Sequence, residues 1–226
     1  MTKKTTGKTK RRGRPRKKEE KQQSKEKITF IPKIITIPDK PLLFDKWEWE
    51  GVEITDQGLE AYISLKPSFL PHSGGRHEHK RFAKSKMNIV ERLINRIMRT
   101  ETNTGKKSKT INIVQSTFEI IHQKTRQNPI QILIKAIENA APREETTRIS
   151  YGGIIYHQAV DVAPLRRIDI SIANITEGAM KTSKNSVKSI EECLADELIA
   201  AAQNNAQKSL AIKKKEEKER IALSAR

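Results

Sequence analysis

The amino-acid sequence predicts a mainly α-helical protein, in which one β-hairpin protrudes from a helical bundle and a disordered basic tail precedes both. Three observations favour this class. Apolar residues recur at helical spacing through most of residues 88–226. The stretch TTRISYGGIIYHQAV changes to β-branched and aromatic residues on both sides of a Gly-Gly pair. Residues 1–27 hold 13 basic and 3 acidic side chains and no aromatic one, so they bury too little apolar surface to offset their chain entropy.

The region between the tail and the helices, residues 28–87, is expected to hold an extended arm, an acidic tryptophan patch and a basic loop. Three prolines interrupt the apolar run of residues 28–43, which favours an arm lying on a surface over a central strand. Residues 44–60 then contain six acidic residues, one lysine and both tryptophans, Trp47 and Trp49. On a basic protein, such a patch favours a protein-facing or internal docking surface over an RNA-binding face.

The helical domain, residues 88–226, is expected to begin with a capping box formed by Asn88 and Glu91. An apolar stripe follows at spacings of three and four residues, and its members are Val90, Leu93, Ile94, Ile97 and Met98. The spacing places three arginines on the opposite face, namely Arg92, Arg96 and Arg99. The sequence TGKK, residues 104–107, is expected to end this helix.

Two further helices are predicted before the hairpin. The first covers about residues 109–125 and turns Ile113, Val114, Thr117, Phe118 and Ile121 inward. The second begins at Asn128-Pro129, where a capping residue precedes a proline at the first helical position. It is expected to end before Pro142 and to bury Ile130, Leu133, Ile134 and Ile137.

The hairpin is predicted at about residues 146–160, around a two-residue turn at Gly152-Gly153 that requires positive φ. Pairing outward from this turn places alternate residues on opposite faces. One face carries Ile149, Tyr151, Ile154 and Tyr156, and the other carries Arg148, Ser150, Ile155 and His157.

Helical periodicity resumes after the hairpin. Helices are predicted from Pro164 to about Thr176, over residues 186–203 and over about residues 207–224. The middle one is expected to bury Val187, Ile190, Leu194, Leu198 and Ala201. Cys193, the single cysteine, excludes an intrachain disulfide framework, fits a reducing cytoplasm and is expected to be a small packing residue.

The charge balance indicates a polyanionic partner. Lys and Arg total 45 against 27 Asp and Glu, which gives a formal net charge of +18. This excess repels itself unless a polyanion neutralises it, and nucleic acid is the leading candidate. An acidic membrane surface is a distant second, and no apolar run approaches the roughly 20 residues that span a bilayer.

No motif indicates an enzyme, a cofactor or a metal site. The stretch TNTGKKSKT lacks the first glycine and the preceding strand of a phosphate-binding loop, so Gly105 is expected to form a turn. His72, His77 and His79 cluster, but no cysteine or further histidine follows at zinc spacing. This loop is instead expected to bring the backbone of Ser73-Gly74-Gly75 close to a phosphate.

The basic side chains fall into separate groups that suit several phosphate tracks of a folded nucleic acid. Aromatic residues make up only 4% of the chain, which argues against a protein that stacks successive bases. The candidate contacts are Arg76, Lys80, Arg81, Lys84, Arg92, Arg96, Arg99, Lys106, Lys107, Lys109, Arg148, Arg166, Arg167, Lys213, Lys214 and Lys215, with Arg220 and Arg226 at the C-terminal end.

Several ordered motifs resemble the universal small-subunit ribosomal protein seven family, called S-five in eukaryotes. These are VERLINRIMRTETNTGKKSKTINIV, AIENAAPREETTRISYGGIIYHQAVDVAPLRRIDI and, typical of the archaeal and eukaryotic branch, PSFLPHSGGRHEHKRFAKSKMNIVERLINR and KSLAIKKKEEKERIALSAR. The resemblance covers about residues 45–226. It implies a helical bundle with a protruding hairpin, a cytoplasmic protein in the small ribosomal subunit, and no enzymatic activity.

The resemblance also implies partners. Members of the family bind the 3′ major domain of small-subunit rRNA and nucleate assembly of the head. Their hairpin and C-terminal end lie near the exit-site tRNA, the mRNA path and the neighbouring small-subunit protein eleven. By position, Lys106 and Lys107 match the family's rRNA contacts, Arg166 and Arg167 match its basic pair, and the hairpin tip corresponds to Tyr151, Gly152 and Gly153.

The basic tail departs from the family pattern, so the resemblance assigns it no role. Its core, RRGRPRKK, suits an rRNA-threading tail. The alternative is a DNA- or chromatin-binding protein that inserts residues 12–16 into a narrow minor groove.

Overall fold

The structure is a computed structural model that describes residues 41–75 and 77–226, and these residues fall into one compact unit. Its elements are α1 (Gln57–Glu60), α2 (Ile89–Met98), α3 (Lys107–Thr125), α4 (Pro129–Ala140), β1 (Glu144–Tyr151), β2 (Ile154–Asp161), α5 (Pro164–Ser183), α6 (Ile190–Ala202) and α7 (Leu210–Ser224). Short 3-10 turns lie at His77–His79, Ala83–Lys86 and Glu101–Asn103. The mainly helical class with one hairpin is confirmed. The basic tail and nearly all of the arm lie outside the described residues.

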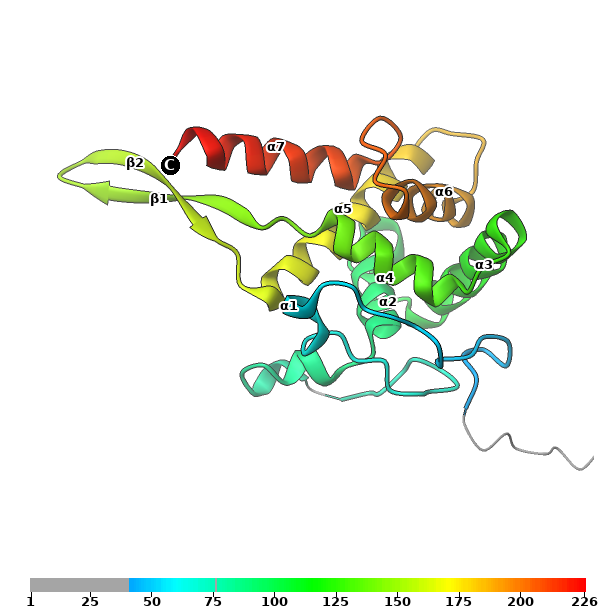
Figure 1. Ribbon diagram of the computed structural model, residues 1–226. Helices are drawn as coiled ribbons and strands as arrows, with labels where there is room; N and C mark the ends of the chain where they lie inside the picture. Colours follow the sequence, from blue (N-terminus) through cyan, green and yellow to red (C-terminus); the bar gives the residue numbers. More distant parts are fainter. Residues whose placement is uncertain (1–40, 76) are drawn as a thin grey trace, which may run out of the picture. The chain divides into compact units, whose positions relative to one another are not determined.

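The core forms where α6 packs against α3, α4 and α5. The buried face of α6 mixes leucines with alanines and Cys193, and small side chains allow neighbouring helices to approach closely. The predicted packing role of Cys193 is therefore confirmed. Figure 1 shows the hairpin extending away from these helices, with α7 running beside its base. No helix among the described residues is long and apolar enough to cross a membrane.

The acidic segment contributes to this core through its aromatic residues. Trp47 and Trp49 are buried, and the ring of Trp47 meets the ring of Phe118 edge-on at 5.7 Å between centroids. Phe44 packs edge-on against the other side of Trp47. The two tryptophans thus dock internally, which is one of the two alternatives left open by the sequence.

The helix starts follow the predicted caps in two cases. Asn88 accepts a hydrogen bond from the backbone N–H of Val90, and Asn128 accepts one from Ile130 ahead of a first-turn proline. The predicted capping box is incomplete, because the Glu91 carboxylate accepts bonds from Ser73 and Lys107. Arg126, in the left-handed region at φ 56°, ends α3.

Three predicted helix boundaries were wrong. Helix α2 ends at Met98, before the TGKK stretch that was expected to end it. Helix α5 continues to Ser183, seven residues beyond the expected end at Thr176. The next helix begins at Ile190 rather than Ser186, because the Ser189 side chain caps it through the N–H of Glu192. Val187, expected in the core, is therefore fully exposed in the preceding loop.

The hairpin has the predicted register. Ile149 pairs with Tyr156 and Tyr151 with Ile154, so these four residues share one face, and both turn glycines have positive φ. Its base is held from outside the ribbon. The N–H of Ala159 donates to the carbonyl of Ala225 at 3.2 Å, and Arg226 forms an ion pair with Glu144.

Helix α5 approaches α6 closely at Gly178. A Cβ atom at this position would lie 2.8 Å from the carboxyl carbon of Glu197. Glu197 is itself buried, and its Oε1 accepts hydrogen bonds from Ser209 Oγ at 2.7 Å and from the N–H of Ala211 at 3.0 Å. This carboxylate therefore fixes the first turn of α7 to α6.

Candidate nucleic-acid interface

An exposed basic surface lies where α2 ends and α3 begins. Arg96 lies in the last turn of α2 and Arg99 directly follows this helix, while Lys106 precedes α3 and Lys109 lies in its first turn. Gly105, at φ 72°, allows the tight turn between the two helices. We call these four side chains the α2–α3 basic surface. Their exposure agrees with the sequence expectation for each of them.

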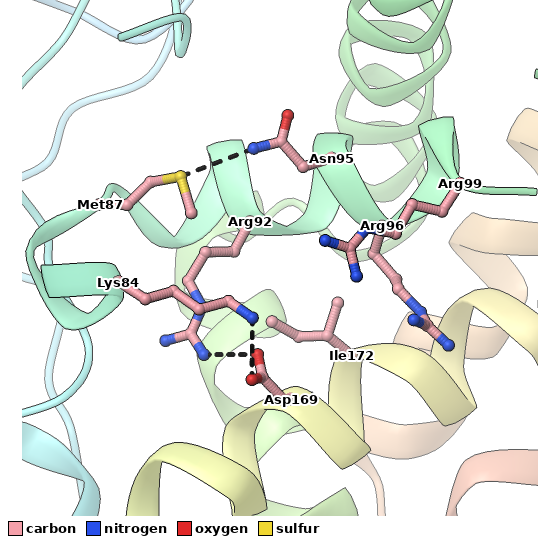
Figure 2. A pocket seen from close by; sticks show the side chains of 8 residues that line it. All are labelled: Lys84, Met87, Arg92, Asn95, Arg96, Arg99, Asp169 and Ile172. Carbon is pink, nitrogen blue, oxygen red and sulfur yellow. Dashed lines mark hydrogen bonds and ion pairs between the residues drawn. The ribbon is translucent and has the colours of Figure 1, made fainter. Parts of the chain in front are cut away.

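Beside this surface, a pocket of about 190 Å³ lies between α2 and α5. Figure 2 shows Lys84 and Arg92 converging on Asp169, while Arg96 and Arg99 extend from α2 at the side of the same pocket. The Asp169 carboxylate accepts hydrogen bonds from Arg92 Nη2 at 2.8 Å and from Lys84 Nζ at 2.9 Å. Burial raises the pKa of Asp169, but these two bonds outweigh it, so the pKa lies below its ordinary value.

The expectation that Arg92 lies on the exposed face of α2 was wrong. The residue is only 4% exposed, because α5 covers that part of the face and supplies Asp169 as its counter-ion. Arg92 also donates through Nη1 to the carbonyl of Tyr62, and its Nε has no hydrogen-bond partner among the described residues. Arg92 is therefore in place to fix the wall of the pocket rather than to face solvent.

Lys107 is also turned inward. Its Nζ lies 2.8 Å from Oε1 of the buried Glu91, which accepts the N–H of Ser73 as well. Burial raises the pKa of Glu91, but the bonds from Lys107 and Ser73 outweigh it and lower the pKa overall. The Ser73 N–H, expected to approach a phosphate, is thus already bonded to a carboxylate. Glu91 ties the basic loop to α2 and α3.

The arginine pair after the hairpin makes contacts within the protein. Arg166 donates to both carboxylate oxygens of Glu145, at 2.6 and 3.1 Å, and thereby holds the base of β1. Arg167 bonds the carboxylate of Asp56 at 2.8 Å and the carbonyl of Pro142 at 3.2 Å. Arg166 remains exposed, whereas Arg167 is half-buried.

The lysines of α7 divide in the same way. Lys213 is exposed, but Lys214 forms an ion pair with Glu177 at 2.6 Å, and Lys215 donates to the carbonyl of Asn139 at 2.8 Å. Arg220 is exposed. The three consecutive lysines therefore have different surroundings, and of the three only Lys213 is exposed.

The loop before α2 presents Lys80 and Arg81 to solvent, and the Arg81 guanidinium lies over the ring of Phe82 at 5.0 Å. Arg76 lies outside the described residues. His77 Nε2 is 2.7 Å from the hydroxyl of Ser73. Within residues 41–75 and 77–226, no group of three metal-binding side chains comes together.

Among the described residues, the hairpin tip gathers several large apolar side chains that are exposed. Tyr151 is 80% exposed, and Ile154, Ile155 and Tyr156 are each exposed by more than half. Arg148 is exposed on the ribbon's other face. A two-stranded ribbon cannot bury both faces by itself, so these side chains are open to a partner.

Three further lysines were missed in the sequence. Lys181, Lys184 and Lys188 line a groove of about 750 Å³ together with Arg96, Arg99 and Lys109. Ending α5 at Thr176 placed Lys181 and Lys184 between two predicted helices, and Lys188 fell in the first turn of the helix predicted over residues 186–203. The signal that was available is the spacing of Ala173, Thr176 and Met180, which continues a helical face beyond that point.

The architecture defines a class of protein: a basic, mainly helical chain with one projecting β-ribbon and several cationic faces. The family described as ribosomal protein S7p/S5e matches residues 59–226. Small ribosomal subunit protein uS7 of Methanothermobacter thermautotrophicus is 58% identical over 184 residues, which are 81% of this chain and 98% of the relative. The proteins of that name from Methanosphaera stadtmanae and Methanococcus maripaludis are 55% and 53% identical, over 81% of this chain and 97% and 98% of their own.

The chain therefore belongs to the ribosomal protein S7p/S5e family. It is a ribosomal protein of the small subunit, with a structural rather than an enzymatic role, and the three relatives named above are archaeal. The resemblance noted in the sequence is confirmed, including the archaeal character of the motifs.

Proposed function

We propose that the chain binds small-subunit rRNA chiefly through the α2–α3 basic surface. The observation that carries this proposal is the exposure of Arg96, Arg99, Lys106 and Lys109 around a single helix junction, on a chain with a net charge of +18. Guanidinium and ammonium groups at such a junction suit several phosphates of a folded RNA without requiring a base sequence. Lys80, Arg81, Arg148, Lys213 and Arg220 extend the contact to neighbouring tracks.

The paired cations take a different part in this proposal. Arg92, Lys107 and Arg167 are at least half-buried and bonded to carboxylates, so each holds the scaffold beneath an exposed cation. Arg166, Lys214 and Arg226 are paired at the surface, where exchange of a carboxylate for a phosphate costs little. Direct rRNA contact is thus assigned first to the exposed side chains and then to this second group.

Membership of the family supports a finer placement of the protein. We infer that the chain binds the 3′ major domain, nucleates head assembly and lies beside neighbouring small-subunit proteins, including protein eleven. The exposed tip at Tyr151, Gly152 and Gly153 supports a contact with exit-site tRNA or the mRNA path, because Tyr151 and its cross-strand partner Ile154 remain largely exposed on the ribbon.

A competition experiment tests rRNA against DNA as the ligand. The full chain, including residues 1–27, is titrated with a head fragment of small-subunit rRNA and with A·T-rich duplex DNA at several salt concentrations. We expect the rRNA fragment to bind at least tenfold more tightly at physiological salt. Equal or tighter binding to the duplex would favour the alternative of a DNA- or chromatin-binding protein that inserts residues 12–16 into the minor groove.

A further inference from the structure

We propose that the groove between the α2–α3 junction and the second half of α5 binds one unstacked nucleotide of RNA, with its base in the groove and its phosphates on the rim. The proposal rests on rRNA binding as the function of the chain, and it names the kind of nucleotide that this groove takes. It is independent of the hairpin and of the tail.

The groove has the size of a ligand site and combines charged with apolar lining residues. Its volume of about 750 Å³ lies within the roughly 300–1,000 Å³ of small-molecule pockets. Its apolar lining, which we call the floor, consists of the half-buried side chains of Ala173, Met180 and Ile190 from α5 and the start of α6. A flat base with two apolar faces suits this floor, whereas a bare phosphate does not.

The rim carries a surplus of positive charge. Six basic side chains line the groove against two acidic ones, Glu101 and Glu177, and Glu177 is bonded to Lys181 at 2.8 Å. Arg96 and Arg99 lie on the ridge that separates this groove from the pocket around Asp169. Planar guanidinium groups can stack on a base and can also bind phosphate. The base and the phosphates of one nucleotide therefore each meet a complementary group.

A duplex fits this groove less well than a single nucleotide. The backbone of an A-form helix is a convex ridge of sugars and phosphates, and its base edges are displayed only in a shallow minor groove. Such a surface meets the rim lysines but leaves the apolar floor empty. Bases splayed out from loops or bulges can enter a cavity, and RNA-binding proteins commonly recognise them there.

Filling the groove without changing its charge tests the proposal. Ala173 is half-buried on the floor, and Ala173→Trp adds an indole where the base is expected to lie. Gln207→Trp is the matched control, because it adds the same side chain to an exposed loop outside the groove. We expect Ala173→Trp to weaken binding of the rRNA head fragment at least about fivefold, which is the low end for one stacked base. The salt dependence should stay unchanged.

A second variant guards against misfolding. Met180→Trp fills another part of the floor, and thermal unfolding shows whether either variant retains the native core. If both variants unfold, crosslinking tests instead whether the groove holds a nucleotide. Ala173→Cys carries a photoreactive aryl azide, while native Cys193 stays unlabelled because it is buried and burial raises the pKa of its thiol.

The outcomes separate this inference from the proposed function. Failure of the unaltered chain to bind the rRNA fragment would overturn rRNA binding itself. Tight binding by both the unaltered chain and a folded Ala173→Trp variant would overturn the nucleotide site in the groove and leave rRNA binding intact. Crosslinks from position 173 to one unpaired nucleotide support the proposal, and crosslinks spread along a paired helix, or none to RNA in the bound complex, contradict it.

Discussion

Arg92 of α2 and Asp169 of α5 are 77 residues apart in the sequence, yet Nη2 of the arginine lies 2.8 Å from Oδ1 of the aspartate. The arginine is buried, and the aspartate keeps part of its surface at the mouth of a pocket lined by Arg96 and Arg99. This pair therefore joins the helical core to the proposed RNA-binding surface.

Removing the carboxylate should cost stability. Asp169→Ala leaves a buried guanidinium without its counter-ion, and we expect the free energy of unfolding to fall by about 1–3 kcal/mol, less than for a fully buried pair because water reaches Asp169. The double variant Arg92→Met, Asp169→Ala should recover most of this loss, since it buries apolar atoms instead of a charge. Urea denaturation measures both. A double variant as unstable as the single one would show that the pair itself does not set the stability.

Acid should weaken the fold through carboxylates that are bonded to lysine or arginine. Hydrogen bonds from Lys181 and Lys214 lower the pKa of Glu177 from 4.5 to about 2. A group whose pKa is lower in the folded state stabilises the protein above its unfolded pKa and loses this effect as the pH falls through the folded value. The free energy of unfolding should therefore fall between about pH 4.5 and pH 2, and less steeply in Glu177→Gln.

The control for this pH series is Glu217→Gln, an exposed position on α7 outside these ion pairs. Denaturant midpoints are measured across the same pH range. Identical profiles for Glu177→Gln and the unaltered chain would contradict the assignment of acid sensitivity to this ion-pair cluster.

The salt dependence of rRNA binding should report the exposed cations. Each phosphate neutralised on duplex DNA contributes about −0.9 to the slope of log K against log salt, and a somewhat smaller value applies to single strands. Replacing Arg96, Arg99, Lys106 and Lys109 with glutamine should flatten the slope by roughly two to four units. Lys135→Gln, on the exposed side of α4, is the control and should leave the slope nearly unchanged. An unaltered slope in the fourfold variant would mean that the α2–α3 basic surface faces solvent and does not contact RNA phosphates.

Shortening the hairpin should separate assembly from translation. Ile149 and Tyr156 are cross-strand partners, so deletion of residues 150–155 and closure with Asn-Gly restores a two-residue turn in register. We expect the variant to enter small subunits normally and those subunits to retain exit-site tRNA less well. Incorporation is measured by quantifying the protein in purified subunits, and tRNA retention by filter binding. Failed incorporation would make the hairpin an assembly element, and normal retention would leave it without a role at the exit site.

The sequence was sufficient for the helices that begin at an Asn cap and carry an unbroken apolar stripe. It was also sufficient for the register of the hairpin. Gly152-Gly153 fixes the turn, and the alternation of side chains along each strand then determines which residues share a face. These features depend on interactions within a few residues of each other. Local rules therefore predict them well.

Long-range pairing could not be read in the same way. Helical spacing alone places Arg92 with Arg96 and Arg99, and only the packing of α5 on that face distinguishes the buried arginine from the exposed two. Glu91 illustrates the same limit, since its position suits a capping box but Lys107 and Ser73 compete for its carboxylate. The groove shows the same limit, because it joins residues of the α2–α3 junction to residues 173–190, a pairing that no short window contains.

The close approach of Gly178 to Glu197 has a consequence for how the sequence can drift. A helical glycine ordinarily weakens its helix, and replacement by alanine would ordinarily be an improvement. Here the added methyl group would meet the carboxylate that anchors α7, so the two positions are free to change only as a pair. Comparison of many relatives should reveal covariation between them, with a larger residue at 178 accompanied by a shorter one at 197 and a different cap for the last helix.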